Sequence, residues 1–405
     1  MKILQINTTV NSGSHGRIAE EIGLSLIAAG HESYIAAAYT VRPSRSQVIR
    51  IGCDFDRKLH GLKTRLFDRH GFGSGASTRK LVNQIKNIDP DIIHLHNIHG
   101  YYLHVGVLFN YLKATNKPVV WTFHDCWPFT GHCSYFDAVN CYKWKTECYR
   151  CPNKSGYPKS LLIDNSLINY RDKRQIFTGI SNMVLVSPSQ WLAGHLRESY
   201  LKDYEIRVIN NGIDTKNFKP VRSDTLRERY KIKGRYILGV ASTWTRRKGL
   251  DDFIRLRAML EPEIGIVLVG LNRNQAGRLP EGIISISRTE NIDELAALYS
   301  GAEVFVNPTY VDNFPTTNIE ALACGTPVIT YNTGGSPEAL DENTGILVEK
   351  GDIRGLDKAV KTILKNEKEQ YSDACRGRAV KLYNKNDKYK DYISLYQSLL
   401  DKNKA

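Results

Sequence analysis

The chain has 405 residues, enough for two domains of ordinary size, and its 41% hydrophobic and 24% charged residues are typical of a folded globular protein, which excludes a disordered one. No apolar run approaches the roughly 20 residues that span a bilayer. The N-terminal MKILQINTTV has too short an apolar core for a signal peptide, so the expected location is cytoplasmic. The formal net charge of +14 favours an acidic partner, such as nucleic acid, an anionic membrane surface or a phosphorylated substrate.

The first half of the chain alternates predicted strands with predicted helices. Strands are expected at Lys2–Asn7, Tyr34–Ala38, Asp91–His96, Pro118–Phe123 and Met183–Ser187. Helices are expected from Ile18 to Gly30, at Leu103–Lys113 and at Ser189–Tyr200, with a loop at Thr8–Gly16 that carries Gly13 and Gly16. This alternation indicates a parallel sheet covered on both faces.

Part of the positive charge lies between residues 57 and 86, where leucine and phenylalanine are interspersed among the basic side chains. Two interpretations stay open for this segment: contact with an anionic membrane, or an ordinary solvated basic face. The basic residues are Arg57, Lys58, Lys63, Arg65, Arg69, Arg79, Lys80 and Lys86.

Five of the eight cysteines lie between Cys126 and Cys151, and Cys148 and Cys151 have the Cys-x-x-Cys spacing of metal ligands. Disulfides are not expected in the cytoplasm. A structural zinc held by Cys133, Cys141, Cys148 and Cys151 is one hypothesis, and four free thiols are the alternative.

The second half repeats the alternation. Strands are expected at Tyr236–Val240, Gly265–Val269, Ile283–Ile286, Val304–Val306 and Val328–Thr330. Helices are expected at Leu250–Leu260, Ile292–Tyr299, Thr317–Ala323 and Ile353–Leu364, and a terminal helix places Tyr389, Tyr392, Ile393, Tyr396 and Leu400 on one face.

The boundary between the halves is expected at residues 187–207, which divides the chain into domains 1–200 and 201–384, with 385–405 as the terminal helix. No low-complexity linker separates the halves, so a deep cleft is expected between the two parallel sheets. Ligands of open parallel sheets bind beyond the carboxyl ends of the strands. The four segments that follow predicted strands there are the Gly13/Gly16 loop, His124, Arg246–Gly249 and the Asp312 loop.

The stretch Asp312–Thr330 contains the strongest local pattern. Asp312 follows a buried strand, and a helix begins near Thr317, whose hydroxyl is expected to form a capping box with Glu320. Two carboxylates thus flank a helix N-terminus that attracts anions, which suits a sugar nucleotide. The alternative is an ordinary capping box and an ordinary loop acid.

Several segments resemble glycosyltransferase family 4. They are RVINNGIDTKNF (Arg207–Phe218), the pair Asp312 and Glu320 with seven residues between them, EALACGTPVI (Glu320–Ile329), TGGSPEAL (Thr333–Leu340) and TGILVEKGD (Thr344–Asp352). HDCWPFTGHC (His124–Cys133) and WKTECYRCP (Trp144–Pro152) are similar to segments of enzymes that assemble bacterial capsule, exopolysaccharide or colanic acid. The resemblance implies the α/β GT-B fold of two Rossmann-like domains, in which domain 1–200 binds the acceptor, domain 201–384 binds the donor and the terminal helix returns to the first domain.

The resemblance also implies retaining transfer of a sugar from a UDP- or GDP-sugar to a glycan or lipid-linked acceptor, with no cofactor required for catalysis. Lys248 corresponds to the lysine that stabilises the leaving diphosphate. The family's arginine five residues earlier is replaced by Thr243, so Arg246 or Arg247 is expected to contact the phosphates. Glu320 corresponds to the acid that holds the ribose.

Asp312 corresponds to the acid that contacts the donor sugar, where the family more often has glutamate. The loop Phe314, Pro315, Thr316, Thr317 replaces a glycine-richer one, and the N–H groups of the threonines are expected to face the sugar or phosphate. His124 corresponds to a histidine at the sugar hydroxyls, with Asp125 expected to orient it. Gly16 is expected to let the backbone approach the diphosphate.

Two alternatives remain. A basic nucleic-acid-binding protein would explain the charge, but the sequence lacks aromatic RNA-binding signatures and a helix-turn-helix pattern, so no nucleic-acid partner is expected. A GT-B enzyme of another reaction type, such as an epimerase, would share the donor site.

Overall fold

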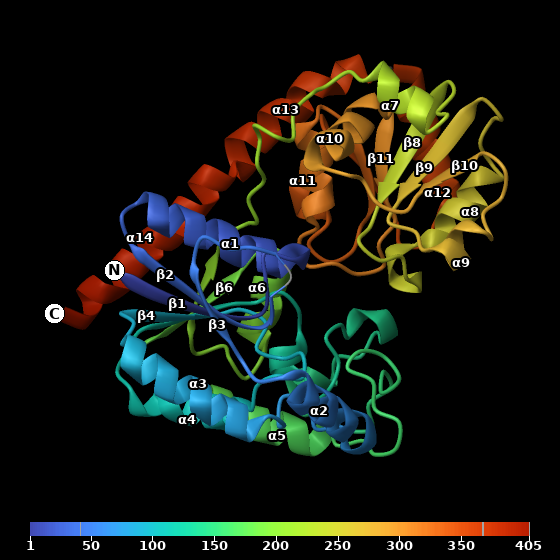
Figure 1. Ribbon diagram of the computed structural model, residues 1–405. Coiled ribbons are helices and arrows are strands. Elements are labelled where there is room, and N and C mark those ends of the chain that lie inside the picture. Colours follow the sequence, from blue (N-terminus) through green and yellow to red (C-terminus); the bar gives the residue numbers. More distant parts are fainter. Residues whose placement is uncertain (41, 367, 405) are drawn as a thin grey trace. The chain divides into compact units, whose positions relative to one another are not determined.

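The computed structural model describes residues 1–40, 42–366 and 368–404, and the chain forms two compact units (Figure 1). The first unit comprises Met1–Asn210 and the chain from Tyr389 onward, and the second comprises Asn211–Lys388. The expected division at residue 200 falls before β7 (Glu205–Val208), which pairs with β6 (Met183–Ser187) in the first sheet. The first unit therefore extends about ten residues further than the sequence patterns indicate.

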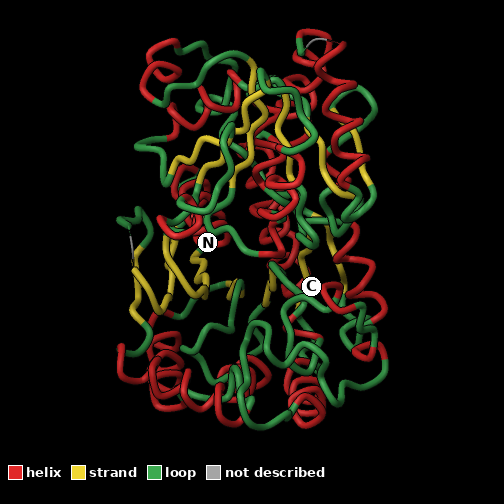
Figure 2. The backbone as a smooth tube through the Cα atoms, turned by 90° about the vertical axis from the view of Figure 1, so that its right-hand side faces the viewer, coloured by secondary structure: helices red, strands yellow, loops and turns green. Residues whose placement is uncertain are grey.

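The first unit is built on a parallel sheet in the order β3-β2-β1-β4-β5-β6-β7. Its remaining strands are β1 (Lys2–Val10), β2 (Glu32–Thr40), β3 (Gln47–Arg50), β4 (Ile92–Leu95) and β5 (Val119–Thr122). Its helices are α1 (Gly13–Ala28), α2 (Asp54–Phe67), α3 (Gly75–Ile88), α4 (Val105–Ala114), α5 (Ser166–Phe177), α6 (Gln190–Glu198) and the greater part of α14 (Lys385–Lys404). In Figure 2 the strands of this sheet, in yellow, have helices, in red, beside them.

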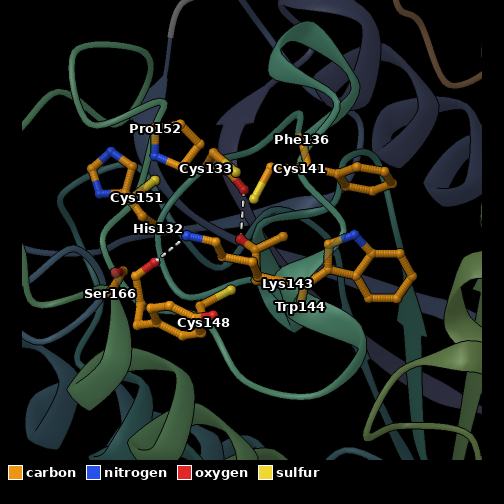
Figure 3. A pocket seen from close by; sticks show the side chains of 12 residues that line it. His132, Cys133, Phe136, Cys141, Lys143, Trp144, Cys148, Cys151, Pro152 and Ser166 are labelled. Carbon is orange, nitrogen blue, oxygen red and sulfur yellow. Dashed lines mark hydrogen bonds between the residues drawn. The ribbon is translucent and has the colours of Figure 1, made fainter.

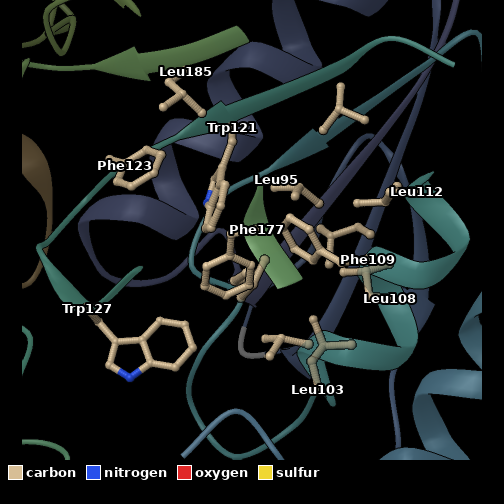
Figure 4. Packing of buried hydrophobic residues seen from close by; sticks show 14 of the residues in the cluster. Leu95, Leu103, Leu108, Phe109, Leu112, Trp121, Phe123, Trp127, Phe177 and Leu185 are labelled. Carbon is tan, nitrogen blue, oxygen red and sulfur yellow. The ribbon is translucent and has the colours of Figure 1, made fainter. Parts of the chain in front are cut away.

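Consecutive residues of the central strands pack against opposite faces of this sheet. Ile92 of β4 contacts the cluster that contains α1 and α14, whereas Ile93 contacts the cluster that contains α3, α4 and α5. A strand buried on both faces needs a continuous apolar run, and this is the signal by which β4, β5 and β6 are predicted. Figure 4 shows the second cluster, in which the Trp121 ring lies 5.0 Å from that of Phe177.

The terminal helix α14 completes the other face through both apolar and polar contacts. Its predicted apolar face is confirmed, since Tyr389, Tyr392 and Tyr396 are buried against β1, β4 and β5. The Tyr396 hydroxyl lies 2.7 Å from His94 Nδ1, and His94 Nε2 lies 2.8 Å from the Thr122 hydroxyl. His94 is thus buried with both ring nitrogens hydrogen-bonded to neutral groups.

The second unit repeats this architecture with the order β10-β9-β8-β11-β12-β13. Its strands are β8 (Arg235–Val240), β9 (Ile264–Val269), β10 (Ile283–Ile286), β11 (Val304–Asn307), β12 (Val328–Tyr331) and β13 (Gly345–Val348). Its helices are α7 (Asp224–Arg229), α8 (Leu250–Arg257), α9 (Arg273–Ala276), α10 (Ile292–Gly301), α11 (Thr316–Ala323), α12 (Ile353–Asn366) and α13 (Glu369–Tyr383). The two parallel sheets with helices on both faces confirm the predicted α/β class.

Helices cover both faces of the second sheet as well. Residues of α10, α11 and α13 form one cluster with alternate strand residues, and residues of α8 and α12 form the cluster on the other face. In each unit the strand order reverses direction beside the first strand of the sheet, between β1 and β4 and between β8 and β11. Ligands of such sheets bind beyond the carboxyl ends of the strands at this switch point.

Across the described part of the chain, no helix combines the length and apolarity needed to cross a bilayer.

The buried His94 predicts an acid-sensitive first unit. Burial lowers the pKa of His94 from 6.5 to about 3. The unfolded chain binds the proton more readily, so the stabilising contribution is complete above pH 6.5 and is lost as the pH falls from 6.5 toward 3. At pH 5 the loss from this side chain is about 2 kcal/mol. Thermal melts at pH 7.5 and pH 5 will show a smaller pH-dependent shift in Tm for His94→Gln than for the unsubstituted protein, and equal shifts would contradict the assignment.

Candidate functional site

Two loops meet at the switch point of the second sheet. The chain leaves β8, forms a 3-10 helix at Arg246–Lys248 and enters α8, while the chain that leaves β11 carries Asp312 into α11. The Tyr310 N–H donates to the Arg247 carbonyl at 2.8 Å, and Lys248 Nζ forms a salt bridge with Asp312 Oδ2. The structure therefore brings the predicted Lys248 and Asp312 into direct contact.

The charge at this junction is positive overall. Arg247 Nη1 lies 3.8 Å from Asp312 Oδ2 and donates to the Val311 carbonyl at 2.6 Å, whereas the Arg246 side chain is exposed. Burial alone raises the pKa of Asp312, but the charges of Lys248 and Arg247 outweigh it and hold that pKa below its ordinary value. Asp312 is therefore ionised at neutral pH, and two cations, Lys248 and Arg247, accompany this one carboxylate.

Two glycines allow these loops to approach one another. Gly249 has φ +74°, and a Cβ there would lie 2.3 Å from the Pro308 carbonyl oxygen. Gly334 has φ +60°, and a Cβ there would lie 2.0 Å from the Asp312 carbonyl oxygen, which accepts the Gly335 N–H at 3.0 Å. Any larger side chain would force the loops apart.

Helix α11 begins at Thr316, with Pro315 as its N-cap. The predicted capping box between Thr317 and Glu320 is wrong, because a proline occupies the capping position and offers no side-chain acceptor. The N–H groups of Thr316 and Thr317 belong to the first helical turn, whose donors have no partner within the helix. They suit an anion at the switch point.

Glu320 is buried, and its side chain is hydrogen-bonded to Tyr299 rather than forming the predicted capping box with Thr317. Its Oε2 accepts a hydrogen bond of 2.9 Å from the hydroxyl of Tyr299 in α10. Burial, with the Glu320 charge, raises the pKa of Tyr299 well above its usual value, so the phenol stays a neutral donor. Tyr299 fixes the orientation of the Glu320 carboxylate, and sequence spacing gave no signal for this contact.

Phe314 contributes to the loop through packing. Its ring is buried 5.6 Å from that of Tyr383, and its carbonyl accepts a hydrogen bond of 3.1 Å from Asn211 Nδ2. Among the predicted donor-binding residues, Phe314 thus anchors the Asp312 loop to the core of the second unit.

The carboxyl edge of the first sheet carries a chain of histidines. His124 Nε2 lies 3.1 Å from His96 Nδ1, and His96 Nε2 lies 2.9 Å from Gln5 Oε1. The His15 ring lies 5.9 Å from that of His124. Burial, followed by repulsion from His96 and His15, lowers the pKa of His124 well below 6.5, so its imidazole is neutral at physiological pH.

Asp125 does not orient His124, contrary to expectation. Its Oδ2 lies 2.9 Å from His99 Nε2, and its Oδ1 accepts the Trp127 N–H at 2.9 Å. The Tyr157 hydroxyl lies 3.4 Å from His99 Nδ1. His99 and Tyr157 are residues that the sequence patterns did not indicate, although His99 follows a predicted strand and that position is the signal that could have found it.

Gly16 lies within helix α1, whereas a loop was expected there. Helix α1 starts at Gly13, and a Cβ on Gly16 would lie 2.6 Å from the Thr9 hydroxyl oxygen at the end of β1. Glycine at this position permits the close packing of α1 on β1 at the switch point of the first sheet.

The four cysteines line one small pocket but do not form a metal centre (Figure 3). Across residues 1–40, 42–366 and 368–404, no three His, Cys, Asp or Glu side chains are arranged to hold a metal ion. Cys148 Sγ accepts the Gly131 N–H at 3.2 Å, and the Cys133 thiol is hydrogen-bonded to Cys151. The predicted zinc site is therefore not formed among the described residues, where Cys133 is buried and Cys141, Cys148 and Cys151 are half-buried.

Two family models together match most of the chain. The model of Glycosyltransferase Family 4 matches residues 15–217, and the model of glycosyl transferases group 1 matches residues 222–379. The chain belongs to glycosyltransferase family 4. It is therefore a glycosyltransferase. This finding favours the glycosyltransferase hypothesis over the hypothesis of a nucleic-acid-binding protein.

One relative and two solved structures resemble this glycosyltransferase over nearly its full length. The chain is 26% identical to WcaC of Escherichia coli K12, a protein assigned to colanic acid biosynthesis as a glycosyl transferase, over 98% of this chain and 100% of WcaC. The sucrose-phosphate synthase of Thermosynechococcus elongatus has a TM-score of 0.73 at 20% identity, covering 98% of this chain and 99% of that one. HepE of Anabaena, solved with UDP-glucose, has a TM-score of 0.70 at 15% identity, covering 98% and 100%. The fold is GT-B, the fold of these glycosyltransferases.

Proposed function

We propose that this glycosyltransferase moves a sugar from a UDP- or GDP-sugar to a hydroxyl of a lipid-linked glycan, with retention of anomeric configuration, during synthesis of a bacterial surface polysaccharide. The observation that carries the proposal is the cluster of Lys248, Arg247 and Asp312 beside the N-terminus of α11 at a sheet switch point. The name of WcaC supports the pathway class, and the UDP-glucose bound to HepE supports the donor class.

The leaving diphosphate is the group that this cluster suits best. Breaking the bond between the sugar and the phosphate leaves additional negative charge on a phosphate oxygen, and a preorganised ammonium lowers the free energy of that state. Lys248 is held by Asp312 before the donor binds, so little reorganisation is needed. Arg247, and Arg246 from the exposed side of the turn, supply further positive charge, and the first-turn N–H groups of Thr316 and Thr317 supply donors.

The two carboxylates bind the transferred sugar and the ribose. Asp312 accepts hydrogen bonds from hydroxyls of the transferred sugar, and Glu320, oriented by Tyr299, accepts from the ribose hydroxyls. In this proposal the second unit binds the donor and the first unit, which includes most of the terminal helix α14, binds the acceptor. His124 of the first unit, neutral at physiological pH, is suited to exchange hydrogen bonds with a sugar hydroxyl.

The reaction proceeds on one face of the sugar. The anomeric carbon loses its bond to the phosphate oxygen and forms a bond to the acceptor oxygen, while the departing phosphate oxygen takes the acceptor proton. No enzyme nucleophile is required, and the chain's task is to hold both substrates and to stabilise the leaving charge. The proposed location is cytoplasmic, at the inner face of the membrane, where the basic segment 57–86 contacts anionic lipid.

Removal of the Lys248 ammonium is expected to slow transfer in a chain that stays folded, because backbone contacts such as that of the Tyr310 N–H with the Arg247 carbonyl still join the two loops. Lys248→Ala is expected to lower kcat by about 100-fold or more, the loss typical of one charge-stabilising donor. Lys361→Ala is the matched control, since Lys361 is also paired with an aspartate, Asp357 at 2.9 Å, but lies on α12. Steady-state kinetics of both variants, with melting curves, check this, and near-native turnover by Lys248→Ala would refute its role.

Glu320 and Tyr299 are expected to act on donor binding as a pair. Glu320→Ala abolishes measurable transfer, because the ribose loses a charged acceptor. Tyr299→Phe keeps the carboxylate but frees its orientation, and the loss of one hydrogen bond, about 1 kcal/mol, raises KM for the donor about fivefold. Isothermal titration with the nucleoside diphosphate separates binding from chemistry, and unchanged affinity in both variants would contradict the assignment.

A donor panel tests the proposed reaction itself. Incubation with UDP- and GDP-sugars and a lipid-linked glycan acceptor is expected to release nucleoside diphosphate and to lengthen the glycan by one sugar, which mass spectrometry detects. Proton NMR of the new linkage reports retention. Conversion of a donor to another nucleotide sugar without acceptor would instead establish an epimerase, and an inverted linkage would overturn the retaining mechanism.

A further inference from the structure

Helix α2 is amphipathic in the reverse sense to an ordinary surface helix. The residues that it buries are polar, namely Arg57, His60 and Thr64. The His60 Nε2 accepts the Gly71 and Gly73 N–H groups at 3.2 Å, and Arg57 Nη1 donates to the Ala38 carbonyl at 3.1 Å. A helix in a globular protein usually turns its apolar stripe to the core.

The outward face of α2 carries the large apolar side chains instead. Phe55, Leu59 and Leu62, which follow one another at helical spacing, are 75%, 56% and 52% exposed, and Phe67 ends the row. The polar contacts of the buried face fix the helix in this orientation, so the apolar row is a feature of the folded state.

A second segment, distant in sequence, extends this apolar surface. The Leu161 N–H donates to the Arg65 carbonyl at 2.7 Å, and the Ile163 N–H donates to the Leu66 carbonyl at 3.3 Å, so these residues lie against the last turn of α2. Leu161, Leu162 and Ile163 are 53%, 66% and 41% exposed. Asn165 Nδ2 donates to the Phe67 carbonyl at 2.8 Å and continues the contact toward α5, whose label lies beside α2 in Figure 1.

Basic side chains surround this surface. Lys58, Lys63 and Arg65 of α2 and Lys159 of the second segment are exposed. Their charge complements an anionic surface, and it disfavours a second copy of this chain, since two such faces would bring like charges together. Exposed apolar residues combined with lysine and arginine are the composition of helices that lie in the headgroup region of anionic bilayers.

We infer that the outer face of α2 and the segment Leu161–Ile163 together form the surface by which the first unit docks on an anionic lipid bilayer. This surface is defined by Phe55, Leu59, Leu62, Phe67, Leu161, Leu162 and Ile163. This surface is smaller than the predicted membrane-contact segment 57–86. It leaves out α3, because α3 shows no large exposed apolar side chain among its described residues. The inference rests on the proposed function only for its setting, a lipid-linked acceptor.

Vesicle flotation with the full chain tests this surface. Vesicles of phosphatidylglycerol and phosphatidylethanolamine are compared with vesicles of phosphatidylcholine alone. The protein is expected to bind the anionic vesicles, and Leu59→Ser/Leu62→Ser and Leu161→Ser/Leu162→Ser are each expected to weaken that binding at least tenfold. Ile292→Ser/Leu382→Ser, which removes two exposed apolar side chains from the second unit, is expected to bind within twofold of the unsubstituted protein.

Charge variants separate α2 from α3. Lys58→Glu/Arg65→Glu is expected to lower binding to anionic vesicles at least fivefold, whereas Lys80→Glu/Lys86→Glu on α3 is expected to lower it less than twofold. If both double variants lose vesicle binding equally, the whole basic segment 57–86 contacts the bilayer, and the assignment to α2 is overturned. Melting curves of every variant exclude unfolding as the cause, since all these side chains are exposed.

Three results would overturn the docking surface: no binding of the unsubstituted protein, unchanged binding of both leucine variants, or a change of oligomeric state in those variants without a change in vesicle binding. The last result would identify the surface as an interface between copies. Transfer to a detergent-free, water-soluble acceptor glycan is expected to be unaffected by the leucine variants. If the unsubstituted protein transfers no sugar to this soluble acceptor, the result counts against the proposed function and not against the docking surface.

Discussion

The salt bridge between Lys248 and Asp312 is the interaction on which the organisation of the second unit's binding edge depends. It joins the loop after β8 to the loop after β11, and these strands are neighbours at the point where the sheet order reverses. The Asp312 side chain is only 16% exposed, and a carboxylate with so little solvent around it destabilises the fold unless a cation accompanies it. The pair therefore holds both loops in place. Gly249 and Gly334 permit the close approach. Together with the backbone contacts between the two loops, this salt bridge joins two distant stretches of sequence and sets the charge beside the N-terminus of α11.

The sequence patterns located the central strands well and the peripheral elements poorly. Strand β6 has its predicted bounds because a strand buried on both faces leaves an apolar run, and the edge strand β10 also has its predicted bounds because clear turns flank its apolar residues. The edge strands β3, β7 and β13 were missed; in β3 and β7 the polar residues Gln47 and Glu205 at exposed positions break that run. Helix α5 was missed for another reason. It buries Asn169 and Lys173, so its inward face does not read as apolar.

The candidate site shows the same limit. The rule that ligands lie beyond strand ends correctly located Lys248 and Asp312 on neighbouring loops. It could not supply Tyr299, because a hydrogen bond between α10 and α11 depends on helix packing rather than on spacing. Adjacency in sequence suggested that Asp125 orients His124, and this was wrong. The Asp125 carboxylate is hydrogen-bonded instead to His99 Nε2, at 2.9 Å. Cysteine spacing similarly indicated metal ligands, but the four cysteines line a small pocket beside Trp144 and, among the described residues, are not arranged to hold a metal ion.

The placement of α14 has a consequence for synthesis on the ribosome. Tyr392 and Tyr396, which cover β4 and β5 of the first unit, are translated only after the whole second unit. The emerging first sheet must therefore wait with the part of one apolar face that α14 covers still exposed, whereas the second unit is a continuous segment that is complete before α14 leaves the exit tunnel. Vectorial folding would then finish the second unit first. A chain cut after Asn210 lacks the closing piece of its own first unit, so the two units are not separable by a single cut.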